Sequence, residues 1–260
     1  MKHKKQNSVL NIIDLSVGYD KKVIANNISF DLIKGELVAI VGINGIGKST
    51  LLRTISGFQP KISGTIQIEG KELASIHTLD LAKKVSVVLT EPIASKNMSV
   101  KELLALGRQP YTNWLGKLSA DDIAFITKSV SLLELEPFLN KKCYELSDGQ
   151  LQRVMIARAL VQDTSIILLD EPTTHLDLYH KVQILKLLKS IAHKTKKTIL
   201  FTSHEIELTI QLCDKMLILD GQTNPFEEPC KLIEHKNFET LFPTDMILFD
   251  ASSGSFKIKS

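Results

Sequence analysis

Residues 42–50 read Gly42-Ile43-Asn44-Gly45-Ile46-Gly47-Lys48-Ser49-Thr50, and their G-x-x-x-x-G-K-S pattern is typical of a phosphate-binding loop. An apolar run at residues 37–41 precedes the loop, and a helix-compatible segment at residues 50–55 follows it. Glycines let successive backbone N–H groups converge on phosphate oxygens, and a helix N-terminus favours an anion. We expect Lys48 to reach the β- and γ-phosphates of a nucleotide and the Ser49 hydroxyl to ligate Mg²⁺. The strand–loop–helix context therefore favours a nucleotide site over an ordinary glycine turn.

The composition of this 260-residue chain excludes several classes of protein. Its net charge is only +3, which argues against a dedicated nucleic-acid binder. No apolar stretch follows the basic residues 1–5, so we expect no secretory signal, and no apolar run approaches the ~20 residues needed to cross a bilayer. Any membrane function must therefore come through a partner chain. The three cysteines, Cys143, Cys213 and Cys230, lack metal-ligand spacing and indicate reduced thiols in a cytosolic protein.

The hydrophobic pattern predicts an α/β fold around the loop. Residues 9–33 predict antiparallel β-structure, because Ile28, Phe30 and Leu32 alternate with polar residues. Further strands are expected at residues 64–70, 85–89, 165–170, 198–202 and 215–219. Apolar strands separated by helices imply a largely parallel sheet that is covered on both faces.

Two segments stand apart from this alternation of strands and helices. Residues 93–150 contain little strand signal and are interpreted as a helical insertion into an α/β domain at residues 8–221. One inserted helix is expected to carry a single apolar face, formed by Ile123, Ile126, Val130 and Leu133. Residues 222–260 are interpreted as a small C-terminal appendage with one or two strands, for example at residues 246–249.

Two adjacent carboxylates narrow the reaction class, because a phosphate-binding loop alone leaves kinase, GTPase and ATPase open. Asp170 ends an apolar strand, where its carboxylate can hold Mg²⁺ through water molecules. Glu171 follows directly and can orient a water molecule for attack on the γ-phosphate. A kinase must instead exclude water and seat an acceptor hydroxyl. The pair therefore favours hydrolysis, with a merely polar strand end as the alternative.

A second helix start that could bind an anion is expected at residues 146–150, Leu-Ser-Asp-Gly-Gln. Ser147 and the N–H groups after it would begin a helix that runs from Leu151 to Leu160. One chain does not need two phosphate-binding segments to bind one nucleotide. Two chains that face each other head to tail would each need one of each kind, so this segment predicts a dimer.

With these segments in place, almost the whole chain resembles the ATP-binding subunits of ABC transporters. Residues 42–49 match the Walker A loop, residues 146–150 resemble the signature loop, and residues 166–170 match Walker B. The resemblance implies a P-loop NTPase (RecA-like) core with an N-terminal antiparallel β-subdomain and an inserted α-helical subdomain. It also implies that Glu171 is the catalytic glutamate and that His204 is a switch histidine on the γ-phosphate.

The resemblance further implies which residues contact ATP. Tyr19 falls where the family places an aromatic that stacks on adenine, although its residue type alone favours a strand-end aromatic that caps the core. Asp177 belongs to a segment that resembles the loop linking the two sites across the dimer. The implied nucleotide-binding residues are Tyr19, Gly42, Asn44, Gly45, Gly47, Lys48, Ser49, Thr50, Ser147, Gly149, Gln150 and Asp177.

Three residues depart from the family pattern. Asp148 stands in the signature where the family usually has glycine, and Ile46 replaces a usually small residue in the phosphate-binding loop. Neither is expected to block binding, because neighbouring backbone N–H groups make the contacts. Glu91 stands where the family places a glutamine that touches Mg²⁺ and senses the permease. A carboxylate can also ligate Mg²⁺, so Mg²⁺ is expected at Ser49, Asp170 and Glu91, with a shifted alignment as the alternative for Glu91.

A finer resemblance concerns the transported substrate. Residues 107–111, Gly-Arg-Gln-Pro-Tyr, resemble the G-R-x-P-Y stretch of subunits that serve iron–siderophore, haem and cobalamin importers. The resemblance implies a homodimer that uses ATP and Mg²⁺ and binds no nucleic acid. Its partners would be a polytopic permease and, indirectly, a substrate-binding protein. The protein would lie peripherally on the cytoplasmic face of the inner membrane. Tyr111 and Trp114 would border a groove for a permease helix, whereas a loop ended by Pro110 is the plainer interpretation.

Two other functions stay open from the sequence. One is a soluble ABC ATPase without a permease, which acts in cluster assembly, repair or translation. The lack of a long coiled-coil insert argues against repair, and the single nucleotide domain argues against translation. The other is a nucleotide-binding regulator that does not hydrolyse ATP, which Asp148 and Glu91 would favour.

Overall fold

The computed structural model describes residues 8–259 except residues 21, 92, 94 and 244. Its centre is a six-stranded sheet in the order β10-β9-β3-β8-β7-β6, in which the short edge strand β10 runs antiparallel and the other strands run parallel. The strands are β3 (Leu37–Gly42), β6 (Val85–Val88), β7 (Ile166–Leu169), β8 (Thr198–Thr202), β9 (Lys215–Leu219) and β10 (Phe226–Glu227). The parallel sheet predicted from the apolar runs is confirmed.

A second, antiparallel sheet has the order β2-β1-β4-β5. Its strands are β1 (Ser8–Tyr19), β2 (Lys22–Ile33), β4 (Ser63–Ile68) and β5 (Lys71–Glu72). Ile28, Phe30 and Leu32 of β2 are buried, while Ser29 and Asp31 between them are exposed. The alternation in the sequence therefore gave the correct inward face of this strand.

Helices cover both faces of the parallel sheet, as the apolar strands require. They include α1 (Lys48–Ile55), α6 (Leu178–Thr195) and α7 (Ile206–Leu212). Leu37, Ala39 and Val41 of β3 belong to a buried cluster with α6, whereas Val38 and Ile40 pack into a second cluster with α1 and the antiparallel sheet. Strand β3 is thus fixed on both sides, and so is the position of the loop that follows it.

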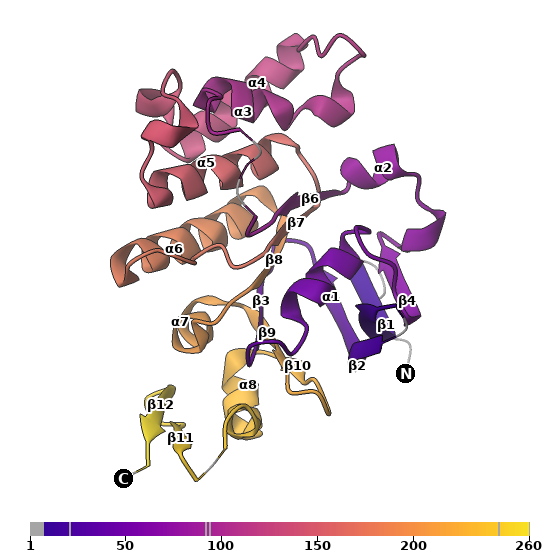
Figure 1. Ribbon diagram of the computed structural model, residues 1–260, viewed down its shortest axis with the longest axis vertical. Helices are drawn as coiled ribbons and strands as arrows, with labels where there is room; N and C mark the ends of the chain where they lie inside the picture. The colour runs from indigo at the N-terminus through magenta and orange to yellow at the C-terminus, as the bar shows by residue number, and fades with distance from the viewer. Residues whose placement is uncertain (1–7, 21, 92, 94, 244, 260) are drawn as a thin grey trace.

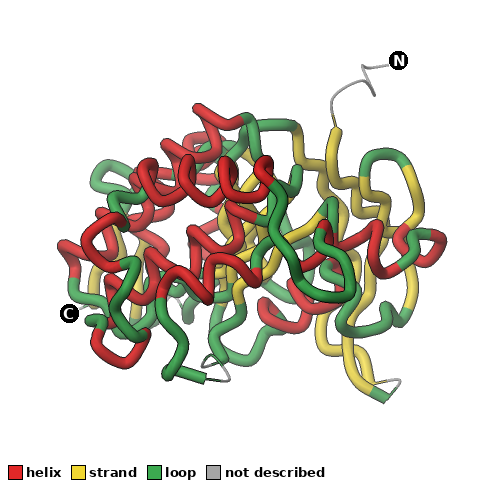
Figure 2. Tube along the Cα trace, turned by 90° about the horizontal axis from the view of Figure 1, so that it is seen from above, coloured by secondary structure: helices red, strands yellow, loops and turns green. Residues whose placement is uncertain are grey.

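The insertion between β6 and β7 is mainly helical. It contains α3 (Val100–Leu106), α4 (Ala120–Leu132) and α5 (Asp148–Val161), which gather at one end of the molecule (Figure 1). A short helix, α2 (Thr78–Ala82), precedes β6. Figure 2 shows the long antiparallel strands on the opposite side from most of the helices. Val130 and Leu133 are buried as predicted, but Ile123 is 55% exposed, so the predicted apolar face of α4 is wrong at its N-terminal end.

The C-terminal part packs on the core. It consists of α8 (Pro229–Glu234) and a hairpin of β11 (Ile247–Asp250) and β12 (Ser255–Ile258). Phe249 of the hairpin stacks on Phe238, with 4.9 Å between the ring centres. Leu232 and Phe238 are fully buried in the same cluster as α6. Within the described part of the chain, none of the helices combines the length and apolar character that a bilayer crossing requires.

Candidate functional site

The phosphate-binding loop connects the carboxyl end of β3 to the start of α1. Its glycines have positive backbone angles, with φ of +156° at Gly42, +78° at Gly45 and +109° at Gly47. A Cβ atom on Gly42 would lie 2.6 Å from the carbonyl oxygen of Leu219, and one on Gly47 would lie 3.0 Å from Cγ2 of Ile24. A larger residue at Gly42 or Gly47 would therefore displace a neighbour or strain the backbone. The glycines therefore allow the backbone of the loop to curve around an open space.

This loop borders a cavity of about 370 Å³. The cavity is lined by Ile24, Asn44, Gly45, Gly47, Lys48, Ser49, Thr50, Glu171 and His204. The structure thus brings the predicted phosphate-contacting residues together with the predicted water-activating glutamate and the predicted switch histidine. Segments that are more than 100 positions apart in the sequence meet here because their strands are neighbours in the sheet.

Lys48 is almost fully buried in the loop. Its Nζ donates to the carbonyl oxygens of Gly42, at 2.9 Å, and Ile43, at 3.1 Å, and lies 3.5 Å from Nδ1 of His204. Burial lowers the pKa of Lys48, and two nearby carboxylates oppose this shift. A desolvated ammonium group gains from any anion that enters its pocket, so the loop is electrostatically suited to phosphate.

Asp170 is buried at the end of β7 and accepts three hydrogen bonds from hydroxyl groups. Its Oδ1 accepts from Ser49 Oγ at 2.9 Å and from Thr202 Oγ1 at 2.7 Å, and its Oδ2 accepts from Thr90 Oγ1 at 2.9 Å. Mg²⁺ prefers oxygen ligands and is usually held by one or two protein groups together with phosphate and water. The adjacent oxygens of Ser49 and Asp170 have the right chemistry for such an ion. In the described residues, no group of three or more His, Cys, Asp and Glu side chains is placed to hold a metal.

Glu171 has a left-handed backbone conformation, with φ of +48°. Its Oε1 lies 2.5 Å from Nε2 of His204, and its Oε2 accepts from Thr174 Oγ1 at 3.0 Å. Its backbone N–H donates to Thr202 Oγ1 at 2.8 Å. A positive φ at a residue other than glycine persists only where surrounding contacts enforce it, and these contacts aim the carboxylate at the cavity. A carboxylate in this place can accept a proton from a water molecule that attacks a phosphate.

Two of the residues predicted to serve a nucleotide at this loop lie outside this arrangement. Glu91 is exposed and pairs with Arg53 of α1, while its neighbour Thr90 makes the contact with Asp170. Tyr19 is half exposed at the end of β1 and is not among the described residues that line the cavity. The contacts of Glu91 with Mg²⁺ and of Tyr19 with adenine remain predictions.

The signature segment lies in a different place. Ser147 begins α5 with a reciprocal cap, in which its Oγ accepts from the Gln150 N–H at 3.3 Å and the Gln150 side chain accepts from the Ser147 N–H at 3.1 Å. Ser147, Gly149 and Gln150 line a second cavity, of about 380 Å³, which shares none of its lining residues with the first. Asp177 caps α6 by accepting from a backbone N–H. One chain therefore keeps its phosphate-binding loop and its signature segment in separate cavities.

Comparison with known proteins identifies the family. Residues 25–174, more than half of the chain, match the sequence model of the family described as ABC transporter. The chain belongs to this family. ABC transporter ATPases couple ATP hydrolysis to transport, and their cassettes form dimers and pair with permease components. The resemblance, the cassette fold and the ATPase class expected from the sequence are thus confirmed.

Individual relatives and a solved structure agree with this assignment. The ABC ATPase is 36% identical over 248 residues to an uncharacterized ABC transporter ATP-binding protein of Methanocaldococcus jannaschii, covering 95% of this chain and 86% of that one. It is 33% identical over 234 residues to the achromobactin transport ATP-binding protein of Dickeya dadantii, covering 89% and 87%. A solved inward-facing transporter described as of metal-chelate type matches with a TM-score of 0.79 at 29% identity, covering 91% of this chain and 89% of that one.

Sequence reasoning missed four residues of the ABC ATPase site. Thr90, Thr174 and Thr202 each bond to Asp170 or Glu171, and Ile24 lines the cavity. Thr202 ends an apolar strand, and a polar residue at the carboxyl end of a buried parallel strand was a usable signal. Ile24 had no such signal, because its place depends on how the antiparallel sheet packs beside the loop.

Proposed function

We propose that this ABC ATPase is the ATP-hydrolysing subunit of an importer for an iron complex, such as a ferric siderophore. The support for the substrate class is the similarity to an achromobactin transport protein and to a transporter of metal-chelate type, together with the G-R-x-P-Y stretch. Haem would be another iron complex of this class, and cobalamin, which contains cobalt, is the alternative substrate. The chain would act from the cytoplasmic face of the membrane, bound to a polytopic permease. A substrate-binding protein would deliver the substrate to this permease.

The proposal of hydrolysis depends chiefly on one observation, the position of Glu171. Its carboxylate borders the same cavity as Lys48 and Ser49 and is fixed by His204 and Thr174. Lys48 would hold the phosphates, Ser49 and Asp170 would hold Mg²⁺, and Glu171 would take the proton of the attacking water. Bound Mg²⁺ would neutralise phosphate charge.

Glu171→Gln tests this role. The variant keeps the shape of the side chain and loses the base, so ATP binding should persist while turnover falls by ~10²–10⁴-fold, as for other general bases. Phosphate release and nucleotide binding are measured on the purified protein. Normal turnover in the variant would show that Glu171 is not the base. Absence of phosphate release from the unmutated protein, with its permease present, would instead favour the regulator that does not hydrolyse ATP.

The separate cavities support a dimer with two shared sites. The phosphate-binding loop of one copy and Ser147 with Gly149 of the other copy would enclose each nucleotide, so ATP would hold the pair closed. Glu171→Gln protein should therefore dimerise when Mg·ATP is added. In a mixed dimer, Ser147→Arg on one copy should damage the site housed in the other copy.

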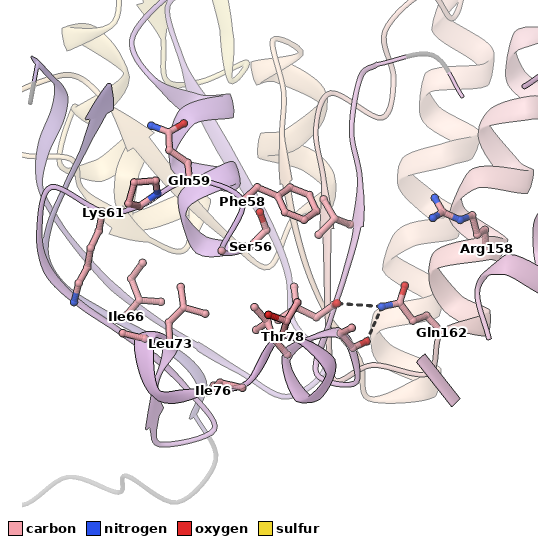
Figure 3. A pocket seen from close by; sticks show the side chains of 17 residues that line it. Ser56, Phe58, Gln59, Lys61, Ile66, Leu73, Ile76, Thr78, Arg158 and Gln162 are labelled. Carbon is pink, nitrogen blue, oxygen red and sulfur yellow. Dashed lines mark hydrogen bonds between the residues drawn. The ribbon is translucent and has the colours of Figure 1, made fainter. Parts of the chain in front are cut away.

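A third cavity offers a different surface for the proposed permease contact, because neither Tyr111 nor Trp114 lines it. It has a volume of about 620 Å³ and lies between the core and the helical insertion. Figure 3 shows the apolar side chains of Phe58, Ile66 and Leu73 on one side, with Arg158 of α5 and Gln162 just after it on the other. The Gln162 amide donates to two backbone carbonyls, but Nε of Arg158 is buried without an acceptor among the described residues. The lining is mainly apolar, so an apolar helix of the permease is the proposed occupant.

Phe58→Asp tests the docking surface, because Phe58 is 65% exposed and would meet an apolar partner directly. The variant should lose copurification with the permease and keep the ATPase activity of the isolated chain. Ile258→Asp is the matched control, since Ile258 is 89% exposed on the C-terminal hairpin. Equal copurification of both variants would refute this surface.

The domain boundaries are a further proposal from the sequence pattern, although β10 at residues 226–227 joins the central sheet. We propose that residues 8–221 form the ATPase domain, with the helical insertion at about 93–150, and that residues 222–260 form an appendage seated on its core. The cargo itself is tested by reconstitution with the permease and the binding protein. Uptake of iron-loaded siderophore, but not of iron salts, is the expected result.

A further inference from the structure

His180 connects Asp177 to the signature segment within one chain. Nδ1 of His180 lies 2.9 Å from both carboxylate oxygens of Asp177, and the backbone N–H of His180 also donates to Oδ1 at 2.9 Å. A carboxylate can only accept, so Nδ1 carries the hydrogen. The imidazole ring is thereby fixed over the first turn of α6.

The opposite side of the imidazole meets the signature glycine. A Cβ atom on Gly149 would lie 3.4 Å from Cδ2 of His180 and 3.8 Å from Cδ2 of Leu176. The space between Gly149 and these two residues of the Asp177 segment is therefore only large enough for a methyl group, and Gly149 and His180 line the same cavity. Tyr179 packs edge-on against the ring, with 5.5 Å between ring centres. The first turn of α5 and the first turn of α6 are joined through this ring.

The same segment also reaches the water-activating glutamate. Thr174 donates to the Glu171 carboxylate, and its backbone N–H donates to the Glu171 carbonyl oxygen at 3.2 Å. From Glu171 to Asp177 the chain runs through only six further residues. A continuous set of contacts therefore extends from Glu171 through Asp177 and His180 to Gly149.

We propose that His180 is a positioning residue that holds Asp177 and the signature segment in register, and thereby couples the two nucleotide sites of the dimer. The inference rests on the proposed shared-site dimer, in which Glu171 serves the nucleotide on its own copy and Gly149 serves the nucleotide on the other. A change at one site then reaches the other through rigid contacts of one chain.

The exposure of the pair indicates a positional role and not a structural one. The side chains of His180 and Asp177 are 49% and 66% exposed, and exposed ion pairs contribute little to stability. Charged groups also line the second cavity, where Arg153 lies 3.7 Å from Glu134. These two side chains compensate each other, so Asp177 is the carboxylate that orients His180.

Two substitutions separate the two contacts of the imidazole. His180→Phe keeps a ring against Gly149 and loses the donor to Asp177, whereas His180→Asn keeps a donor near the position of Nδ1 and loses the ring. His193→Phe is the matched control, because His193 lies on the same helix and its Nε2 is 2.9 Å from a carboxylate oxygen of Asp214, outside both cavities.

The assay measures ATP hydrolysis by the purified full chain across ATP concentrations. We expect kcat/KM to fall about tenfold in His180→Phe, the usual effect of losing one hydrogen bond to a charged group. Asp177→Ala should have a similar effect, and the double variant should lose no more than either single variant. The Hill coefficient should fall towards 1 in both His180 variants and stay at the unmutated value in His193→Phe.

Additive losses in the double variant, or equal behaviour of His180→Phe and His193→Phe, would overturn the inference while leaving the ATPase assignment intact. A measurement without activity gives an independent result. Amide hydrogen exchange at residues 147–151 should be faster in His180→Asn than in His193→Phe, because the ring no longer supports α5. Unchanged exchange would also count against the link. Failure of the unmutated chain to hydrolyse ATP would contradict the proposed function itself.

Discussion

Thr202 offers the sharpest test of how the two catalytic carboxylates are held. Its hydroxyl donates to Asp170 at 2.7 Å and accepts from the Glu171 backbone N–H at 2.8 Å, and the residue is fully buried. Thr202→Val replaces the hydroxyl with a methyl group of similar size. The substitution therefore removes both hydrogen bonds and changes the packing very little.

The size of the effect follows from these contacts. A hydrogen bond to a charged group contributes about 1.5–3 kcal/mol, and a buried donor left without an acceptor costs about 1–3 kcal/mol. Asp170 keeps its bonds to Ser49 and Thr90, which limits the loss. We expect Thr202→Val to be about 3–5 kcal/mol less stable than the unmutated protein, which corresponds to roughly 10 °C in Tm for a chain of this size.

Activity should fall as well, because the Glu171 N–H helps to hold the uncommon backbone angle of that residue. A displacement of about 1 Å in a catalytic group commonly costs about 10²-fold in rate. Urea unfolding and phosphate release are the two measurements. Thr202→Ser is the control, since it keeps the hydroxyl and loses only a methyl group, at a cost of about 0.8 kcal/mol. Equal unfolding midpoints for Thr202→Val and Thr202→Ser would refute the reasoning.

Three further predictions concern buried charges and thiols. Arg108→Ala should destabilise the protein by about 3–5 kcal/mol, because it leaves the Asp122 carboxylate buried without the partner that lies 2.7 Å away. The double variant Arg108→Met, Asp122→Leu should recover most of that loss, as measured by urea unfolding. Burial alone would raise the pKa of Asp122, but hydrogen bonds from its helix cap and from Arg108 hold this pKa below its usual value. The stability that the Asp122 carboxylate contributes is therefore fully present above about pH 4, and it is lost as the pH falls through the lowered pKa. The loss of stability with falling pH should accordingly be less steep in Asp122→Asn. Burial raises the pKa of the thiols of Cys143 and Cys213, whereas Cys230 is exposed. A thiol reagent should therefore modify Cys230 quickly and the other two cysteines only after unfolding, which mass spectrometry would measure.

The fold was largely readable from the sequence because its central strands are buried on both faces. Such strands produce continuous apolar runs, and the runs at residues 198–202 and 215–219 coincide with β8 and β9. The prediction for α4 was less accurate, since an apolar residue near the start of an inserted helix has no fixed neighbour to pack against. Ile123 fits the helical period and is nevertheless exposed.

The candidate site was readable only where a motif fixes the local backbone. Gly45 and Gly47 of the phosphate-binding loop and Glu171 after β7 are such positions, and they line one cavity. The segment after β6 has no comparable constraint. There the structure directs Thr90 to Asp170 and Glu91 to Arg53, a choice that depends on the exit direction of the chain and on the charge of α1. Spacing alone could not distinguish these two neighbours.

The topology places the two halves of the proposed shared site on different parts of the fold. The phosphate-binding loop, Asp170 and Ser203 follow three adjacent parallel strands, so a single sheet edge fixes their relative positions. The signature segment instead comes from the insertion between β6 and β7, and no strand of that sheet holds it. Helix α5 contacts α3, α4 and β6, and its first turn faces His180 of α6 across the second cavity. In the proposed shared-site dimer, a half fixed by the sheet of one copy would therefore face a half held by the helical insertion of the other copy.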